Sequence, residues 1–153
     1  MTRMVIAALT ACAAIAATGA RAQDACATWP QQMQAADRGV MQQITGVWTT
    51  QEPDGMGGMA DVQVSYAPDG TMTYDRRACY SMPGLGTSCP TSSGYGAWVA
   101  HSNQGGGFFL ATNLRTSLSN GQATQGCGGF NAYLADPSTM VGQNGQVVAR
   151  RVR

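Results

Sequence analysis

Few residues of this sequence have the type and spacing that catalysis needs. His101 is the only histidine, and a histidine base needs a nucleophile and an orienting carboxylate beside it. Ser102 follows it directly, but neighbouring residues of a strand point to opposite faces. The chain has no G-x-S-x-G motif and no lysine, which excludes a nucleophile elbow and a G-x-x-x-x-G-K phosphate loop. We therefore predict a protein that is not an enzyme and uses no cofactor.

Two methionines have a spacing that thioether copper sites use. Met56-Gly57-Gly58-Met59 brings two soft sulfur ligands near each other, and Cu(I) prefers such ligands. The glycines between them favour a plain loop between the first two strands. A thiolate zinc site is not expected either, because the cysteines show no C-x-x-C spacing. We predict no metal site.

Arg76 occupies the most informative position of any charged residue. Counting by twos from Met72 and Tyr74 places it on their face of a strand. If that face lines a barrel interior, the arginine needs a partner or an anionic ligand. The alternative is a bulge or strand end that turns Arg76 and Arg77 to solvent. The predicted ligand-binding residues are Tyr66, Tyr74, Arg76 and Phe108.

One helix is predicted in the segment that precedes the first strand. Between Thr28 and Ile44 the apolar residues Met33, Ala36, Val40 and Ile44 recur at spacings of three and four. Thr28 is the expected N-cap, and the proline that follows suits the first turn. We expect the apolar stripe to pack on the protein's own domain.

Beyond this helix the apolar residues alternate, which is the period of a β-strand. Turn signals separate the alternating segments at Pro68-Asp69-Gly70, Ser119-Asn120-Gly121 and Asn144-Gly145. The expected strands are Ile44–Thr50, Asp61–Ala67, Thr71–Tyr80, Gly94–His101, Phe108–Arg115, Phe130–Ala135, Thr139–Gly142 and Gln146–Val152, with one more allowed between Leu114 and Gly128. About eight short strands with short connections suit a barrel or a sandwich. We predict an all-β fold: a small antiparallel up-and-down barrel of about eight strands with one short N-terminal helix.

Composition excludes several classes of protein. The chain has 153 residues, enough for one domain, and 11% of them are charged, against roughly 25% in an ordinary domain. It has 9 basic residues without a large cluster, so no nucleic-acid partner is expected. Most of the expected strands are nearer six or seven residues, fewer than the roughly 9–11 of outer-membrane barrels.

The first 22 residues resemble an export signal. A short start with Arg3 precedes an apolar run, Val5–Ala17, and Ala20-x-Ala22 is a small-x-small cleavage pattern. We predict a signal peptide at 1–22, an N-terminal helical segment at 23–43 and a barrel domain at 44–153, with no membrane span after cleavage. A lipoprotein box ending at Cys12 is the alternative. The protein is expected in the periplasm or outside the cell.

Four cysteines remain after that cleavage. An even number in an exported protein indicates two disulfides, and four cysteines allow three pairings. We favour a short link between Cys79 and Cys89, across a loop rich in Pro and Gly. The long link would then join Cys26 to Cys127 and tie the N-terminal segment to the body.

The first strand carries a motif that resembles the lipocalin (calycin) family. Gly46-Val47-Trp48 follows the short helix, a meander comes next, and arginines lie in the last strand. The resemblance implies that Trp48 packs at the closed end of an eight-stranded barrel and that an arginine lies across it. The candidates are Arg150 and Arg151, and we assign Arg150 to this structural role.

These features lead to two hypotheses on function. The first is an exported, non-enzymatic, lipocalin-like protein that binds a small apolar or amphipathic ligand. The alternative is a periplasmic interaction protein, such as a protease inhibitor or an envelope component that docks on a protein partner. The second resemblance behind it is to small periplasmic protease inhibitors, which are also disulfide-containing barrels with an early G-x-W. A third hypothesis is a hydrolase whose site the sequence does not reveal.

Overall fold

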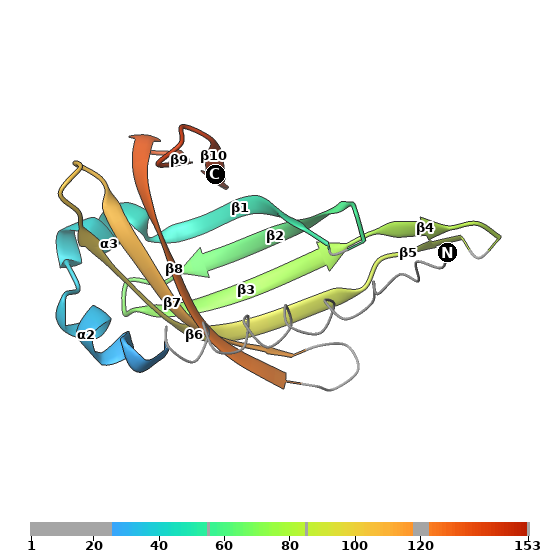
Figure 1. Cartoon of the computed structure of the whole chain (residues 1–153), viewed down its shortest axis with the longest axis horizontal. Helices are drawn as coiled ribbons and strands as arrows, with labels where there is room; N and C mark the ends of the chain where they lie inside the picture. The colour runs from blue at the N-terminus through green and yellow to red at the C-terminus, as the bar shows by residue number, and fades with distance from the viewer. Residues whose placement is uncertain (1–25, 55, 85, 118–122, 153) are drawn as a thin grey trace, which may run out of the picture.

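A closed antiparallel β-barrel forms the body of the protein. The computed structural model describes residues 26–54, 56–84, 86–117 and 123–152. The predicted leader at 1–22 and the predicted turn at 119–121 lie outside these residues. Eight strands close in the order β1-β10-β9-β8-β7-β6-β3-β2, and each is antiparallel to its neighbours. The predicted all-β, up-and-down barrel is confirmed (Figure 1).

The strands follow one another around the barrel, with one hairpin inserted. The barrel strands are β1 (Gly46–Pro53), β2 (Met59–Tyr66), β3 (Thr71–Ala78), β6 (Thr91–Ser102), β7 (Phe108–Ser117), β8 (Ala123–Asp136), β9 (Thr139–Gly142) and β10 (Val147–Arg151). The inserted hairpin consists of β4 (Tyr80–Met82) and β5 (Gly86–Ser88). It projects beyond the end of the barrel that lies away from the helices (Figure 1).

Several strand predictions were wrong in extent. The strand expected at Ile44–Thr50 is Gly46–Pro53, because Ile44 belongs to a helix. β6, β7 and β8 have 12, 10 and 14 residues, more than the six or seven expected. The separate strand allowed between Leu114 and Gly128 belongs to β8, which continues unbroken to Asp136. Three glycines within β8 hide this continuity, because glycine normally punctuates a strand pattern. The loop expected after Tyr80 contains the β4–β5 hairpin, whose strands are too short to show alternation.

The predicted single helix is two helices, α2 (Trp29–Gln34) and α3 (Arg38–Ile44). Asp37 separates them in an extended conformation. Its side chain accepts hydrogen bonds from the backbone N–H groups of Gly39 (2.8 Å) and Val40 (3.1 Å). An aspartate is more stable as this N-cap than inside a helix, and that preference ends the first helix and starts the second.

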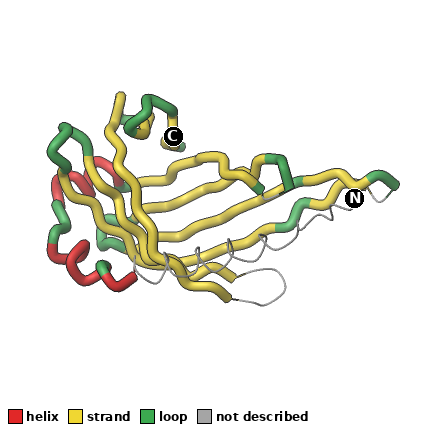
Figure 2. Tube along the Cα trace, in the orientation of Figure 1, coloured by secondary structure: helices red, strands yellow, loops and turns green. Residues whose placement is uncertain are grey.

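The helices close one end of the barrel, as Figure 2 shows. Met41 and Ile44 of α3 are buried there with Trp48, Trp98 and other apolar side chains. The Trp48 indole N–H donates to the Ile44 carbonyl (2.7 Å), and the Trp98 indole N–H donates to the Ala67 carbonyl (3.0 Å). Both indoles therefore keep a hydrogen bond although they are buried.

Both predicted disulfides are present. Cys26 is bonded to Cys127, and Cys79 is bonded to Cys89. Cys127 lies on β8, so the long disulfide fastens the N-terminal segment to the barrel wall. The short disulfide closes the base of the β4–β5 hairpin.

The barrel wall is incomplete at the end away from the helices. β9 pairs with β8 only from Ala132 to Asp136, and β10 pairs with β1 only at Trp48 and Thr49. Residues 123–131 of β8 and 50–53 of β1 therefore have no described strand on that side. This gap is called the side opening below.

Candidate functional site

A cavity of about 330 Å³ lies inside the barrel, on the β1, β9 and β10 side. Its lining is mostly apolar or aromatic, with a few polar groups: Trp48, Thr50, Gln51, Glu52, Val64, Tyr66, Phe130, Met140, Gln146, Val147, Val148 and Ala149. Residues of β1 and β10 that border the side opening belong to this lining. The volume lies within the range of small-molecule sites, roughly 300–1,000 Å³.

Glu52 brings a carboxylate into this cavity. It lies on the inward face of β1, two and four residues after Thr50 and Trp48. Its Oε2 accepts a hydrogen bond from the Tyr74 hydroxyl (3.2 Å). Sequence reasoning missed Glu52, although strand alternation counted from Trp48 would have placed it inside.

The negative charge of Glu52 contributes to a raised pKa in two tyrosines. Burial, followed by the charge of Glu52, raises the pKa of Tyr66 well above its ordinary value. Burial and the same carboxylate raise the pKa of Tyr74 to about 12. Both phenols are therefore neutral hydrogen-bonding groups at physiological pH.

The four predicted ligand-binding residues do not all meet at this cavity. Tyr66 lines it and packs on Trp98, with ring centroids 4.9 Å apart. Tyr74 is not part of the lining, but its hydroxyl donates a hydrogen bond to Glu52, which is. Phe108 is buried in the core among the residues of the closed end, and it is not part of the cavity lining.

Arg76 lies on the inward face of β3. The pairing of β2 with β3 runs without a bulge from Ala60 to Tyr66, so Arg76 alternates with Arg77, which is exposed. Arg76 is half-buried, and its Nη2 donates to the Pro53 carbonyl (3.4 Å). The strand continues to Ala78, which is why neither a bulge nor a strand end turns Arg76 outward.

Arg151, and not Arg150, lies over Trp48. The guanidinium carbon of Arg151 is 4.6 Å from the centroid of the indole ring, and its Nη2 donates to the Gln43 carbonyl. The assignment of Arg150 was wrong because Arg150 pairs with Thr49 on the outward face, whereas Arg151 pairs with Trp48. Gly46 has a φ of 136°, and a Cβ added there would lie 3.8 Å from Cδ and Nε of Arg151, so this arginine passes beside both motif residues, Gly46 and Trp48.

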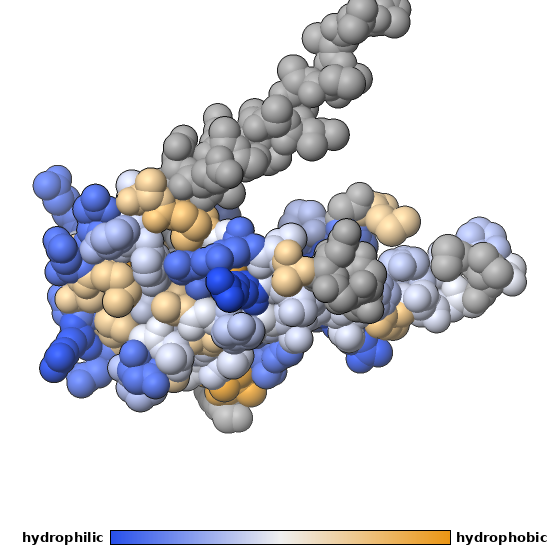
Figure 3. All heavy atoms as spheres, turned by 90° about the horizontal axis from the view of Figure 1, so that it is seen from below, coloured by the Kyte–Doolittle hydropathy of each residue, from blue (hydrophilic) through white to orange (hydrophobic). Residues whose placement is uncertain are grey.

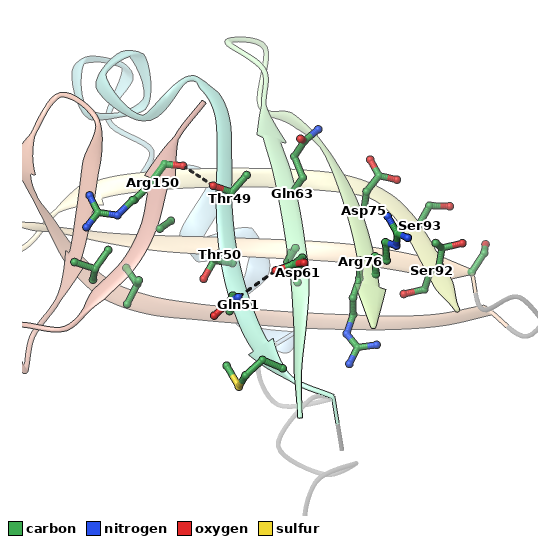
Figure 4. A pocket seen from close by; sticks show the side chains of 18 residues that line it. Thr49, Thr50, Gln51, Asp61, Gln63, Asp75, Arg76, Ser92, Ser93 and Arg150 are labelled. Atoms are coloured by element: carbon green, nitrogen blue, oxygen red, sulfur yellow. Dashed lines mark hydrogen bonds between the residues drawn. The ribbon is translucent and has the colours of Figure 1, made fainter. Parts of the chain in front are cut away.

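A second, larger hollow of about 1350 Å³ is lined by residues of β1, β2, β3, β6, β7 and β10, with Arg76 among them. It shares Thr50, Gln51, Val147, Val148 and Ala149 with the barrel cavity. Two rows of exposed side chains flank it, and the register of the strands aligns each row (Figure 4). One row is Thr49, Gln63, Asp75 and Ser93; the other is Gln51, Asp61, Arg77 and Thr91. The hollow is open and polar, and its rows carry charges of both signs, so it does not favour one class of ligand.

The remaining candidate residues do not form a chemical site. The Nε2 of His101 is 3.1 Å from the Gln32 side-chain oxygen, while the Ser102 hydroxyl donates to Asp37. These contacts attach the helices to the barrel, so the serine and histidine do not act as a pair. Met56 and Met59 are both exposed, on the loop after β1 and at the start of β2. Nowhere in the described ranges do three His, Cys, Asp or Glu side chains gather as a metal site requires.

The surface shows no dominant apolar area on the face seen in Figure 3. The exposed large apolar side chains are spread over several elements: Met33, Met56, Met59, Tyr95, Phe130, Tyr133, Val147 and Val152. Among the described helices, none has the length and apolar character of a membrane span.

Comparison with known proteins gives no relative. No family model, no curated protein and no solved structure matches the chain.

Proposed function

We propose that this protein is an exported, lipocalin-like binding protein that takes a small amphipathic molecule into the barrel. The observation that carries the proposal is the cavity, in which apolar and aromatic side chains face a small polar group made by Glu52 and Tyr74. Such a combination holds an apolar body and orients one polar end. The Trp48–Arg151 contact supports the lipocalin-like assignment, because that resemblance implies an arginine across this tryptophan.

Export is part of the same proposal. The two disulfides are compatible with an oxidising compartment. The signal peptide at 1–22 remains a prediction, and mass measurement of the mature protein tests it. A mature chain that starts at Gln23 supports it, whereas an acylated chain that starts at Cys12 contradicts it.

Native mass spectrometry of protein purified from its own cells tests the binding function. We expect a small molecule to co-purify and to be lost from a Val64→Trp variant, in which a larger side chain occupies the cavity. Asp61→Asn, on the outer face of the same strand, is the matched control and should retain the molecule. A wild-type protein that is free of ligand from its own cells, and that also binds none from their extract, contradicts the proposal.

The projecting hairpin favours a second candidate function, docking on another protein. The described side chains of β4 and β5 are exposed, apart from Tyr80 at the base. The hydroxyls of Ser81 and Thr87 are hydrogen-bonded across the hairpin (3.0 Å), and the Cys79–Cys89 disulfide links the two strands at its base. Shortening the hairpin to a tight turn between Cys79 and Cys89 should abolish partner capture and leave ligand binding intact if this function holds.

A further inference from the structure

Glu52 is the one charged residue among the described residues that line the barrel cavity. It is also the only glutamate of the chain. Among the described residues, its side chain has one hydrogen-bond partner, Tyr74, which donates to Oε2. Its second carboxylate oxygen is therefore left to interact with whatever fills the cavity.

The nearby arginines donate hydrogen bonds to backbone carbonyls. Arg76 donates to the Pro53 carbonyl, and Arg151 lies over Trp48 and donates to the Gln43 carbonyl at the closed end. Neither forms an ion pair with Glu52, and neither lines the cavity. A partly buried carboxylate without a cationic partner favours a ligand that supplies the positive charge.

Aromatic rings complete the environment of such a charge. Tyr66, Phe130 and Trp48 line the same cavity, and Val64 and Met140 add apolar surface. An ammonium group gains attraction from aromatic faces as well as from a carboxylate. The apolar wall suits a short hydrocarbon body attached to that group.

We infer that the barrel cavity selects a small amphipathic amine, with its ammonium group at Glu52 and its apolar body among Val64, Phe130 and Met140. This inference rests on the proposed ligand-binding function and names the class of ligand. It reverses the charge expected from Arg76 alone, which would have selected an anion.

Calorimetric titration with three eight-carbon probes tests the inference. Octylamine, octan-1-ol and octanoate have eight carbons each and differ in the polar group at one end. The cavity of about 330 Å³ corresponds to about eleven water molecules in the liquid, so we chose probes of this small size. We expect octylamine to bind at least about tenfold more tightly than octan-1-ol, and octanoate to bind most weakly, because a charge-assisted hydrogen bond exceeds a neutral one.

Two variants localise the effect. Glu52→Gln keeps the shape of the side chain and should reduce octylamine affinity about tenfold, to near that of octan-1-ol, while octan-1-ol binding stays unchanged. Asp61→Asn removes the same charge from the exposed face of β2 and should leave all three affinities unchanged. If Glu52→Gln does not fold, the ratio of octylamine to octan-1-ol affinity in the wild-type protein decides by itself.

The outcomes separate the inference from the function beneath it. Equal affinities for octylamine and octan-1-ol, or an unchanged octylamine affinity in folded Glu52→Gln, overturn the amine selectivity and leave ligand binding standing. Absence of binding by all three probes also overturns it. The proposed function is then decided by native mass spectrometry of the protein from its own cells.

Discussion

The two ends of this barrel use the same strands in opposite ways. At the closed end, inward positions hold large side chains that are almost completely buried, including Trp48, Trp98 and Leu110. Toward the other end, inward positions of β1 and β3 hold Glu52, Tyr74 and Arg76, which remain half-exposed beside the buried Ala60, Val62 and Ala78. The closed end provides the stability, and this leaves the open end free to carry polar groups that a core would not tolerate.

Glycine explains much of the difference. On the inward face, β6 has Gly94 and Gly96, and β8 has Gly126 and Gly128, where the closed end has bulky side chains. Some of these positions are filled by neighbouring chain, and others are empty. Because these glycines have no side chains and because β9 and β10 are short, the open half of the barrel is less filled than the closed half.

The largest expected effect concerns the disulfide that fastens the N-terminal segment to the barrel wall. Replacing Cys26 and Cys127 by serine removes a link with a sequence separation of 101. We expect the free energy of unfolding to fall by about 4.7 kcal/mol in the chain-entropy account, against roughly 3 kcal/mol for the short Cys79–Cys89 link. Urea titration of the two double variants measures both losses. A larger loss from the short link would contradict this ranking.

Truncation of one side chain at each end tests the comparison directly. Trp48→Ala should lower the free energy of unfolding by about 3–5 kcal/mol, because a large buried side chain leaves a cavity. Leu114→Ala, on the inward face of β7 in the open half, should cost roughly 1–2 kcal/mol because that side chain is only half-buried. Thermal denaturation ranks the two variants, and equal losses would show that the open half is packed as a core.

Two glycines beside Leu114 distinguish filled from empty inward positions. Gly96 and Gly126 pair with Leu114 from opposite sides. A Cβ at Gly96 would overlap the Asn113 carbonyl oxygen, whereas nothing lies within 4 Å of a Cβ at Gly126. We expect Gly96→Ala to destabilise by about 1–3 kcal/mol and Gly126→Ala to be neutral or to stabilise by about 0.5 kcal/mol. Chemical denaturation should show a loss of unfolding free energy for Gly96→Ala and none for Gly126→Ala, and two losses of equal size would contradict an open position at Gly126.

The two arginines at the end of β10 form a matched pair at the closed end. Arg151→Gln removes the cation over Trp48 and should cost about 1–2 kcal/mol. Arg150→Gln removes an exposed charge and should change the free energy of unfolding by less than about 0.5 kcal/mol. Equal effects in thermal denaturation would mean that the cation–indole contact does not stabilise the closed end.

The sequence predicted the closed end better than the open end. Alternation in β2 and β3, the close spacing of Cys79 and Cys89 and the Gly46–Trp48 motif indicated the barrel, because each is a local pattern. The choice between Arg150 and Arg151 failed because a shift of one residue in the pairing of β10 exchanges inward and outward faces. Glu52 was missed because the first strand was expected to end at Thr50, whereas β1 continues to Pro53 and carries the alternation two residues further.

A further expected effect is a change of stability in alkaline solution, and it depends on the polar group of the open end. Because the folded protein raises the pKa of Tyr74 to about 12 from the ordinary value of 10.0, the folded state holds this proton where the unfolded state releases it. The contribution is complete below pH 10 and is lost as the pH rises toward 12. Tyr74→Phe should flatten the fall in unfolding free energy over this interval.

Glu52→Gln separates the two causes of that pKa shift. Burial remains in this variant, but the charge of Glu52 is gone, so Tyr74 should titrate at lower pH than in the wild-type protein. Tyrosinate absorbance during alkaline titration measures this, with Asp61→Asn as the control for a carboxylate removed outside the barrel. An unchanged titration in Glu52→Gln would show that burial alone holds the Tyr74 proton, and the polar group of the open end would then act through Tyr74 without the help of Glu52.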